Sequence, residues 1–112
     1  MLKGFFDRTL ACGVAWTFPP ESGAGAAPTT GLVPLLTNIE RVMGVSTYGS
    51  PQHVTILAGD NGRNCISTAV RHGTCAPDCT LAWLGLYNMD YQSRDAREEF
   101  LRHVCAYVRD QF

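Results

Sequence analysis

Short apolar segments separated by turn-forming residues constrain the fold of this chain more than any other feature. They lie at 5–18, 32–43, 54–58, 65–70, 79–87 and 93–112. None is an unbroken apolar run of the roughly eighteen residues that a membrane-spanning helix needs, so we expect no membrane partner. A chain of 112 residues can bury one hydrophobic core. We therefore expect a single domain, 1–112, made of several short elements.

Two segments have the periodicity of amphipathic helices. Residues 32–43 carry Leu, Ile, Val and Met at spacings of three and four, and Thr29 or Thr30 can cap such a helix. Residues 93–111 combine an apolar stripe with a charged face, and Ser93 is a candidate N-cap. The sequence therefore predicts helices over 32–43 and 93–111.

Other segments favour strands. Residues 14–18 alternate large apolar and small side chains before a Pro-Pro break. Residues 54–58 and 65–70 flank a Gly-Asp-Asn-Gly segment, which is typical of a β-hairpin turn. Residues 79–87 are too few for a stable helix and contain a glycine, so they also favour a strand.

These elements together predict an α+β fold, with a small antiparallel sheet of three to four strands and two helices packed on one face. Residues 19–31 are rich in Pro, Gly, Ala and Thr and predict a flexible loop. A sheet this small leaves an edge and a face uncovered, and a second copy of the chain would cover them. We therefore expect a homo-oligomer, in the form of a homodimer.

The N-terminal segment has a weak secretory pattern, since Lys3 and Arg8 precede an apolar stretch. Asp7 and the break at Pro19 and Pro20 do not fit that pattern, so we expect the segment to belong to the domain. The chain has five cysteines, and an odd number is not typical of a secreted disulfide framework. We therefore expect a reducing, cytoplasmic setting.

The charge balance excludes one class of partner. Nine basic and ten acidic residues give a net charge of −1. Proteins that bind nucleic acids or other polyanions in general carry a basic surplus or a basic stripe. We therefore expect no nucleic-acid partner.

One turn concentrates the residues that can bind a metal or carry thiol chemistry. His72, Cys75 and Cys79 lie close together, and the Cys-x3-Cys spacing is compatible with a structural zinc site. Cys65 is a candidate for the fourth ligand, and a His or Cys residue of the predicted helix at 93–111 is an alternative. Packed free thiols and a local disulfide between Cys75 and Cys79 are the competing interpretations.

Catalytic patterns are otherwise weak. Cys75 and His72 are compatible with a nucleophilic pair, but no third group that would orient the histidine is apparent. Gly59 and Gly62 lack the spacing of a phosphate-binding loop, and the hairpin explains them. The sequence therefore predicts no catalytic residue and no cofactor other than zinc.

The functional expectation is a small non-enzymatic interaction protein, of inhibitor, adaptor, immunity-factor or chaperone type, that binds the surface of a partner protein. Aromatic side chains, which are favoured at interfaces, are frequent in so short a chain. For Trp16 and Trp83, the competing interpretation is that their side chains pack in the core and are not exposed at an interface. The alternative is a zinc-binding or thiol-dependent protein centred on the 72–79 turn, with or without enzymatic activity.

Overall fold

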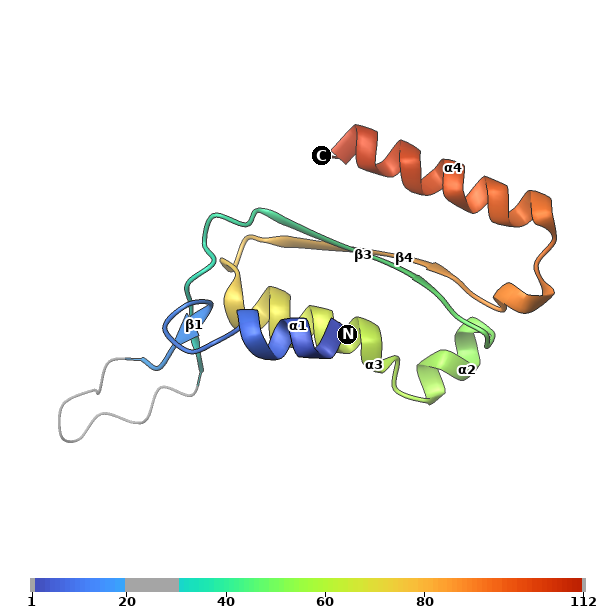
Figure 1. The fold of residues 1–112 in the computed structure, drawn as a ribbon. Helices are drawn as coiled ribbons and strands as arrows, with labels where there is room; N and C mark the ends of the chain where they lie inside the picture. The colour runs from blue at the N-terminus through green and yellow to red at the C-terminus, as the bar shows by residue number, and fades with distance from the viewer. Residues whose placement is uncertain (1, 20–30, 112) are drawn as a thin grey trace. The chain divides into compact units, whose positions relative to one another are not determined.

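Helices and strands both contribute to the structure (Figure 1). This computed structural model describes residues 2–19 and 31–111. In chain order the elements are α1 (Leu2–Thr9), β1 (Trp16–Thr17), β2 (Val33–Pro34), β3 (Arg41–Thr47), α2 (Gln52–Leu57), α3 (Asn61–Cys65), the π-helix η1 (Ile66–His72), β4 (Thr80–Leu86), the 3₁₀ turn η2 (Met89–Tyr91) and α4 (Arg94–Gln111). The mixture of helix and strand confirms the predicted α+β class.

Internal contacts divide the chain into two compact units. Unit 1 comprises Met1–Val42 and Asn64–Leu81, and unit 2 comprises Met43–Arg63 and Ala82–Phe112. Each unit therefore combines two segments that are distant in the sequence. The expectation of a single domain, 1–112, stays a prediction.

In unit 1, a short antiparallel ribbon organises the N-terminal segment. β1 and β2 pair with Trp16 opposite Pro34. The Trp16 indole Nε1 donates a hydrogen bond of 2.8 Å to the Leu10 carbonyl, which ties the ribbon to the chain that follows α1. Ala15 is buried, and its carbonyl accepts a hydrogen bond of 2.9 Å from the Leu35 N–H. The predicted strand at 14–18 is therefore present, but reduced to two residues.

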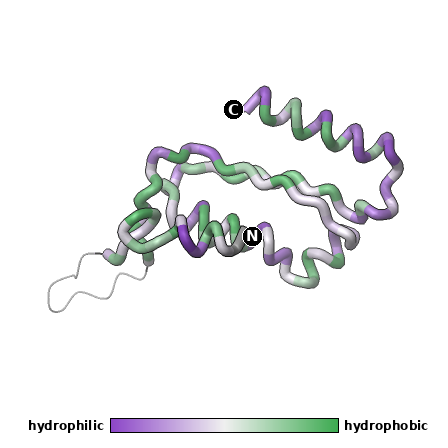
Figure 2. Tube along the Cα trace, in the orientation of Figure 1, coloured by the Kyte–Doolittle hydropathy of each residue, from purple (hydrophilic) through white to green (hydrophobic). Residues whose placement is uncertain are grey.

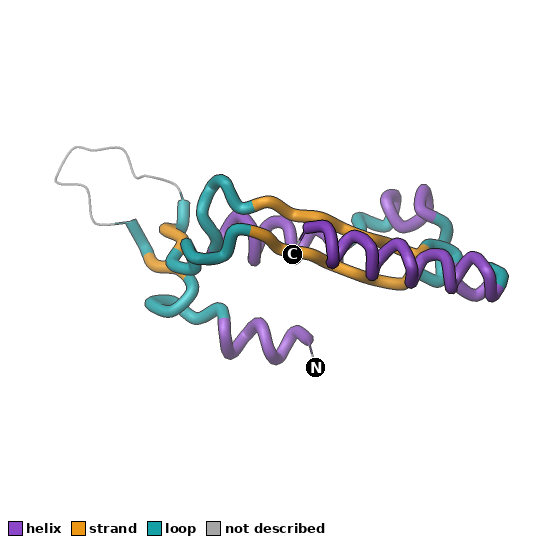
Figure 3. The backbone as a smooth tube through the Cα atoms, turned by 90° about the horizontal axis from the view of Figure 1, so that it is seen from above, coloured by secondary structure: helices purple, strands orange, loops and turns teal. Residues whose placement is uncertain are grey.

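β3 and β4 form a two-stranded sheet, and they lie side by side in both views (Figures 1 and 3). Within unit 2, Gly44 of β3 lies against the Trp83 ring of β4. Further along both strands, the Tyr48 N–H donates a hydrogen bond of 2.8 Å to the Leu86 carbonyl. Both contacts occur in the same order along the two strands, so the strands are parallel. The predicted antiparallel sheet of three to four strands is wrong, because each sheet in the described residues has two strands.

The predicted helix over 32–43 is also wrong. Its residues form β2 and the start of β3, and a turn in which the Ile39 N–H binds the Leu36 carbonyl at 3.2 Å separates the two strands. The apolar spacing of three and four therefore came from two extended segments on either side of a turn. β3 also contains Val42 and Val45, whose branched side chains favour strands.

The predicted hairpin at 54–70 is replaced by the helices α2, α3 and η1. Parallel strands cannot be joined by a tight hairpin and need a longer crossover, which helices usually supply. The turn signal was real but lies between helices, because Gly59 (φ +96°) and Asp60 (φ +41°) adopt left-handed backbone between α2 and α3. Short apolar runs of this length do not distinguish strand from helix.

The last two predicted elements are confirmed as β4 and α4. The Ser93 Oγ accepts a hydrogen bond of 3.1 Å from the Ala96 N–H, as expected of an N-cap. Arg94 and Glu98 form an ion pair of 2.8 Å one turn apart. No helix among the described residues is long and apolar enough to cross a membrane. Most of the predicted loop at 19–31 lies outside the described residues.

Candidate functional site

The cysteine-containing turn of unit 1 is the candidate site. A tight turn spans Ala76 to Cys79, in which the Cys79 N–H donates to the Ala76 carbonyl at 3.0 Å. Pro77 occupies the second position of the turn, where its fixed φ is favourable. Cys75 directly precedes this turn and Cys79 is its last residue, and both are free thiols with 2% and 1% of their surface exposed. The turn therefore brings two buried thiols together.

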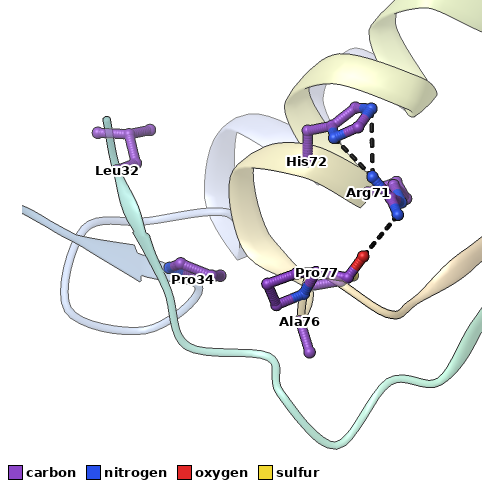
Figure 4. A pocket seen from close by; sticks show the side chains of 7 residues that line it. Leu32, Pro34, Arg71, His72, Ala76 and Pro77 are labelled. Atoms are coloured by element: carbon purple, nitrogen blue, oxygen red, sulfur yellow. Dashed lines mark hydrogen bonds between the residues drawn. The ribbon is translucent and has the colours of Figure 1, made fainter. Parts of the chain in front are cut away.

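Arg71 holds the turn in place from the end of η1. Its Nε donates to the Cys79 carbonyl at 2.7 Å, and its Nη2 donates to the Pro77 carbonyl at 2.8 Å. Its Nη1 lies 2.6 Å from Nδ1 of His72 (Figure 4). A planar guanidinium fixes several acceptors at once, so Arg71 determines where the Cys79 backbone lies.

Backbone contacts with two other segments fix the position of Cys75. Its N–H donates to the Arg71 carbonyl at 3.3 Å, and it forms a parallel bridge with Leu36. The neighbouring Thr74 is also buried, and its Oγ1 donates to the Val70 carbonyl at 2.6 Å. The backbone of Cys75 is therefore held between η1 and the segment that follows β2.

Burial raises the pKa of the Cys79 thiol above its ordinary value of 9.0. The Cys75 side chain, through its charge and a hydrogen bond, raises this pKa further, whereas the positive charge of Arg71 lowers it. The Cys79 thiol is therefore protonated near neutral pH. A thiol in this state is a weak nucleophile, because the thiolate is the reactive form.

The remaining predicted ligands, His72 and Cys65, do not complete a metal site with this pair. The His72 ring is engaged with the Arg71 guanidinium, and Cys65 is exposed. No three His, Cys, Asp or Glu side chains in the described part of the chain gather closely enough to hold a metal ion. A structural zinc site needs four ligands, and of His72, Cys65, Cys75 and Cys79 the structure brings together the last two.

A pocket of about 300 Å³ adjoins the turn (Figure 4). Leu32, Pro34, Ala76 and Pro77 line it together with Arg71, His72 and Cys75. Arg71 and His72 project from η1, so one side of the pocket is polar and carries the charge of Arg71, whereas the rest is mainly apolar. The sequence contained no signal for this pocket, because β2 and η1 are far apart in the chain and neither was predicted.

A second polar cluster lies in unit 2 and was also missed. The Tyr48 hydroxyl donates to Oδ1 of Asp60 at 3.0 Å and accepts a hydrogen bond of 2.9 Å from the Trp83 indole. The Tyr48 ring stacks on Tyr87, with ring centres 4.6 Å apart. No side-chain nitrogen or oxygen atom of the described residues is left buried without a hydrogen-bond partner. We interpret this cluster as structural, because it ties the turn after α2 to both strands.

Burial and the Asp60 carboxylate raise the pKa of Tyr48 above its ordinary value of 10.0. For Cys79 and Tyr48 alike, the fold therefore favours the protonated form. Their contribution to stability is fully present below the unfolded pKa of each group and is lost as the pH rises through the folded pKa. We expect the urea midpoint of unfolding to fall above pH 9, and Tyr48→Phe to weaken the fall above pH 10. Equal midpoints from pH 7 to pH 11 would contradict this expectation.

The helix α4 presents an exposed apolar stripe. Leu101 and Val108 have 61% and 43% of their surface exposed, and Cys105 between them is also exposed. These three residues, here called the Leu101 stripe, recur at helical spacings of four and three and so share one face. Figure 2 shows apolar and polar residues alternating along α4. Phe100, Val104 and Tyr107 lie on the adjoining side of the helix and are half-buried.

Comparisons of the chain with protein-family models, with curated proteins and with solved structures gave no match.

Proposed function

We propose that this protein is a small non-enzymatic interaction protein, of inhibitor, adaptor, immunity-factor or chaperone type, that acts by binding the surface of another protein. The observation that supports this most is the Leu101 stripe. No residue of the eighteen-residue helix α4 is buried. Helices in proteins obtain most of their stability from packing an apolar face, and a further chain would supply that packing.

The spacing of the Leu101 stripe suits one mode of recognition. Helices that bind in a groove of another protein use apolar anchors at intervals of three and four residues. Each large aliphatic side chain that leaves water contributes about 1.5–3 kcal/mol when it is fully buried. Leu101 and Val108 would be the anchors, and Cys105 would lie between them in the contact.

A second copy of this chain is the first partner that we propose, so that the protein would be a homodimer. The sheet of β3 and β4 has two strands, so each strand has one edge without a neighbouring strand among the described residues. Open edges favour pairing with another chain. The strand edges of residues 43–47 and 82–86 and the Leu101 stripe all belong to unit 2, which makes this unit the proposed binding unit.

Sedimentation velocity of the purified chain over a wide range of concentrations tests the proposal. We expect a mass that rises from 12.2 kDa toward twice that value. If the mass stays at 12.2 kDa, a photo-crosslinker on Cys105, in a variant with Cys12→Ser and Cys65→Ser, tests for a different protein partner in extracts of expressing cells. A monomer that also yields no discrete crosslinked species would contradict the proposed function.

A further inference from the structure

We propose that Cys75 and Cys79 are a redox-active thiol pair, in which Cys75 reacts with a low-molecular-mass disulfide in the adjoining pocket and Cys79 then closes an intramolecular disulfide. This inference rests on unit 1 and is independent of the proposed binding function of unit 2. Nothing in it requires a partner protein.

A tight turn of the backbone brings the two cysteine residues together. Cys75 directly precedes the hydrogen-bonded turn Ala76–Cys79, Cys79 closes that turn, and both cysteines are buried. Arg71 fixes the carbonyl groups of Pro77 and Cys79. The pair is therefore held together before any oxidation, which lowers the entropic cost of closing a bond between the two sulfur atoms.

The two cysteines have different access to small molecules. Cys75 lines the pocket of about 300 Å³, and Cys79 is not among its lining residues. The Arg71 guanidinium gives one wall a positive charge, so the pocket favours a disulfide that carries carboxylate groups, such as glutathione disulfide. This arrangement assigns the first reaction to Cys75 and leaves Cys79 as the resolving thiol.

The reaction balances as two thiol–disulfide exchanges. The Cys75 thiol loses its proton to solvent and its sulfur attacks one sulfur of glutathione disulfide, which forms a mixed disulfide and releases one glutathione thiolate. The Cys79 thiol then loses its proton, and its sulfur attacks the Cys75 sulfur and releases the second glutathione thiolate. The two released thiolates take up the two protons, so the protein is oxidised by two electrons and glutathione disulfide is reduced to two glutathione molecules.

The test exposes the native protein to glutathione disulfide, blocks the remaining thiols with N-ethylmaleimide and maps the peptides by mass spectrometry. We expect the wild-type 75–79 segment to lose two hydrogens and to carry no glutathione. Cys79→Ser should accumulate glutathione on Cys75, whereas Cys75→Ser should leave Cys79 unmodified. The exposed thiols of Cys12, Cys65 and Cys105 should carry glutathione in all three proteins and serve as internal controls.

Circular dichroism of each variant checks that it is folded, and the wild-type result stands without the variants. If Cys75 and Cys79 both remain reduced in the folded wild-type protein while the three exposed cysteines carry glutathione, the proposal is wrong. Glutathione that accumulates on Cys79 in folded Cys75→Ser would also overturn the assigned order of reaction.

Discussion

Gly44→Val is expected to lower the free energy of unfolding by about 3 kcal/mol or more, because the new side chain has no space. A Cβ atom at Gly44 would overlap the six-membered ring of Trp83. Trp83 cannot move away freely, since its indole N–H is bound to the Tyr48 hydroxyl at 2.9 Å. Domains of this size are stable by about 5–15 kcal/mol, so the variant would lose a large part of its stability.

Urea unfolding followed by tryptophan fluorescence measures this effect, and two further glycines provide controls. Gly85→Ala should give a smaller loss, because its Cβ would approach the Tyr87 ring at 2.9 Å. Gly62→Ala should stabilise α3 by about 0.5–1 kcal/mol, because a Cβ there meets no atom within 4 Å. If Gly44→Val and Gly62→Ala unfold at the same urea concentration, the parallel register of β3 and β4 is wrong.

The double variant Leu101→Ser/Val108→Ser is expected to weaken association about 100-fold. Both side chains are exposed in the isolated chain, so their replacement should change its stability little. In a complex, the loss of two partly buried apolar anchors removes about 3 kcal/mol of binding free energy. Sedimentation velocity measures the dissociation constant of each homodimer. If the partner is a different protein, titration calorimetry measures the dissociation constant of that complex.

Glu99→Ser is the matched control, because this exposed residue lies on a different face of α4 from the Leu101 stripe. It should leave the dissociation constant within about twofold of the wild-type value, since exposed charges contribute little. Equal dissociation constants for the double variant and the wild-type protein would show that α4 is not the contact.

Local signals predicted those elements that local chemistry determines. The Ser93 hydroxyl caps α4 as its sequence position indicates, and the apolar run at 79–87 forms β4. By contrast, the helix at 32–43 and the hairpin at 54–70 were wrong, because their apolar spacings fit either type of structure. The parallel pairing of β3 with β4 determines which segments are strands and which are helices. The paired residues are far apart in the chain, so a local sequence pattern cannot predict the pairing.

The candidate site was predicted only in part, because part of it depends on local turn chemistry and the rest on contacts between distant segments. Cys75 and Cys79 are separated by a Pro-Asp turn, whose local chemistry brings them together as the sequence indicated. The role of Arg71 was missed, because it donates to main-chain carbonyl groups. Every residue has such a carbonyl, so the sequence does not show which ones an arginine will bind. His72 and Cys65 lie on helical segments, whereas the sequence predicted a turn at His72 and a strand at Cys65, so their placement relative to the Cys75–Cys79 pair could not be derived.

The measurement that tests the central claim most directly is the reactivity of Cys105, the thiol within the Leu101 stripe. Brief alkylation of the native protein, at high concentration and in extracts of expressing cells, compares Cys105 with Cys12 and Cys65, which are also exposed. If another chain covers α4, Cys105 should react several times more slowly than the other two, and the difference should disappear in Leu101→Ser/Val108→Ser. Equal reactivity of all three thiols under both conditions would contradict the account.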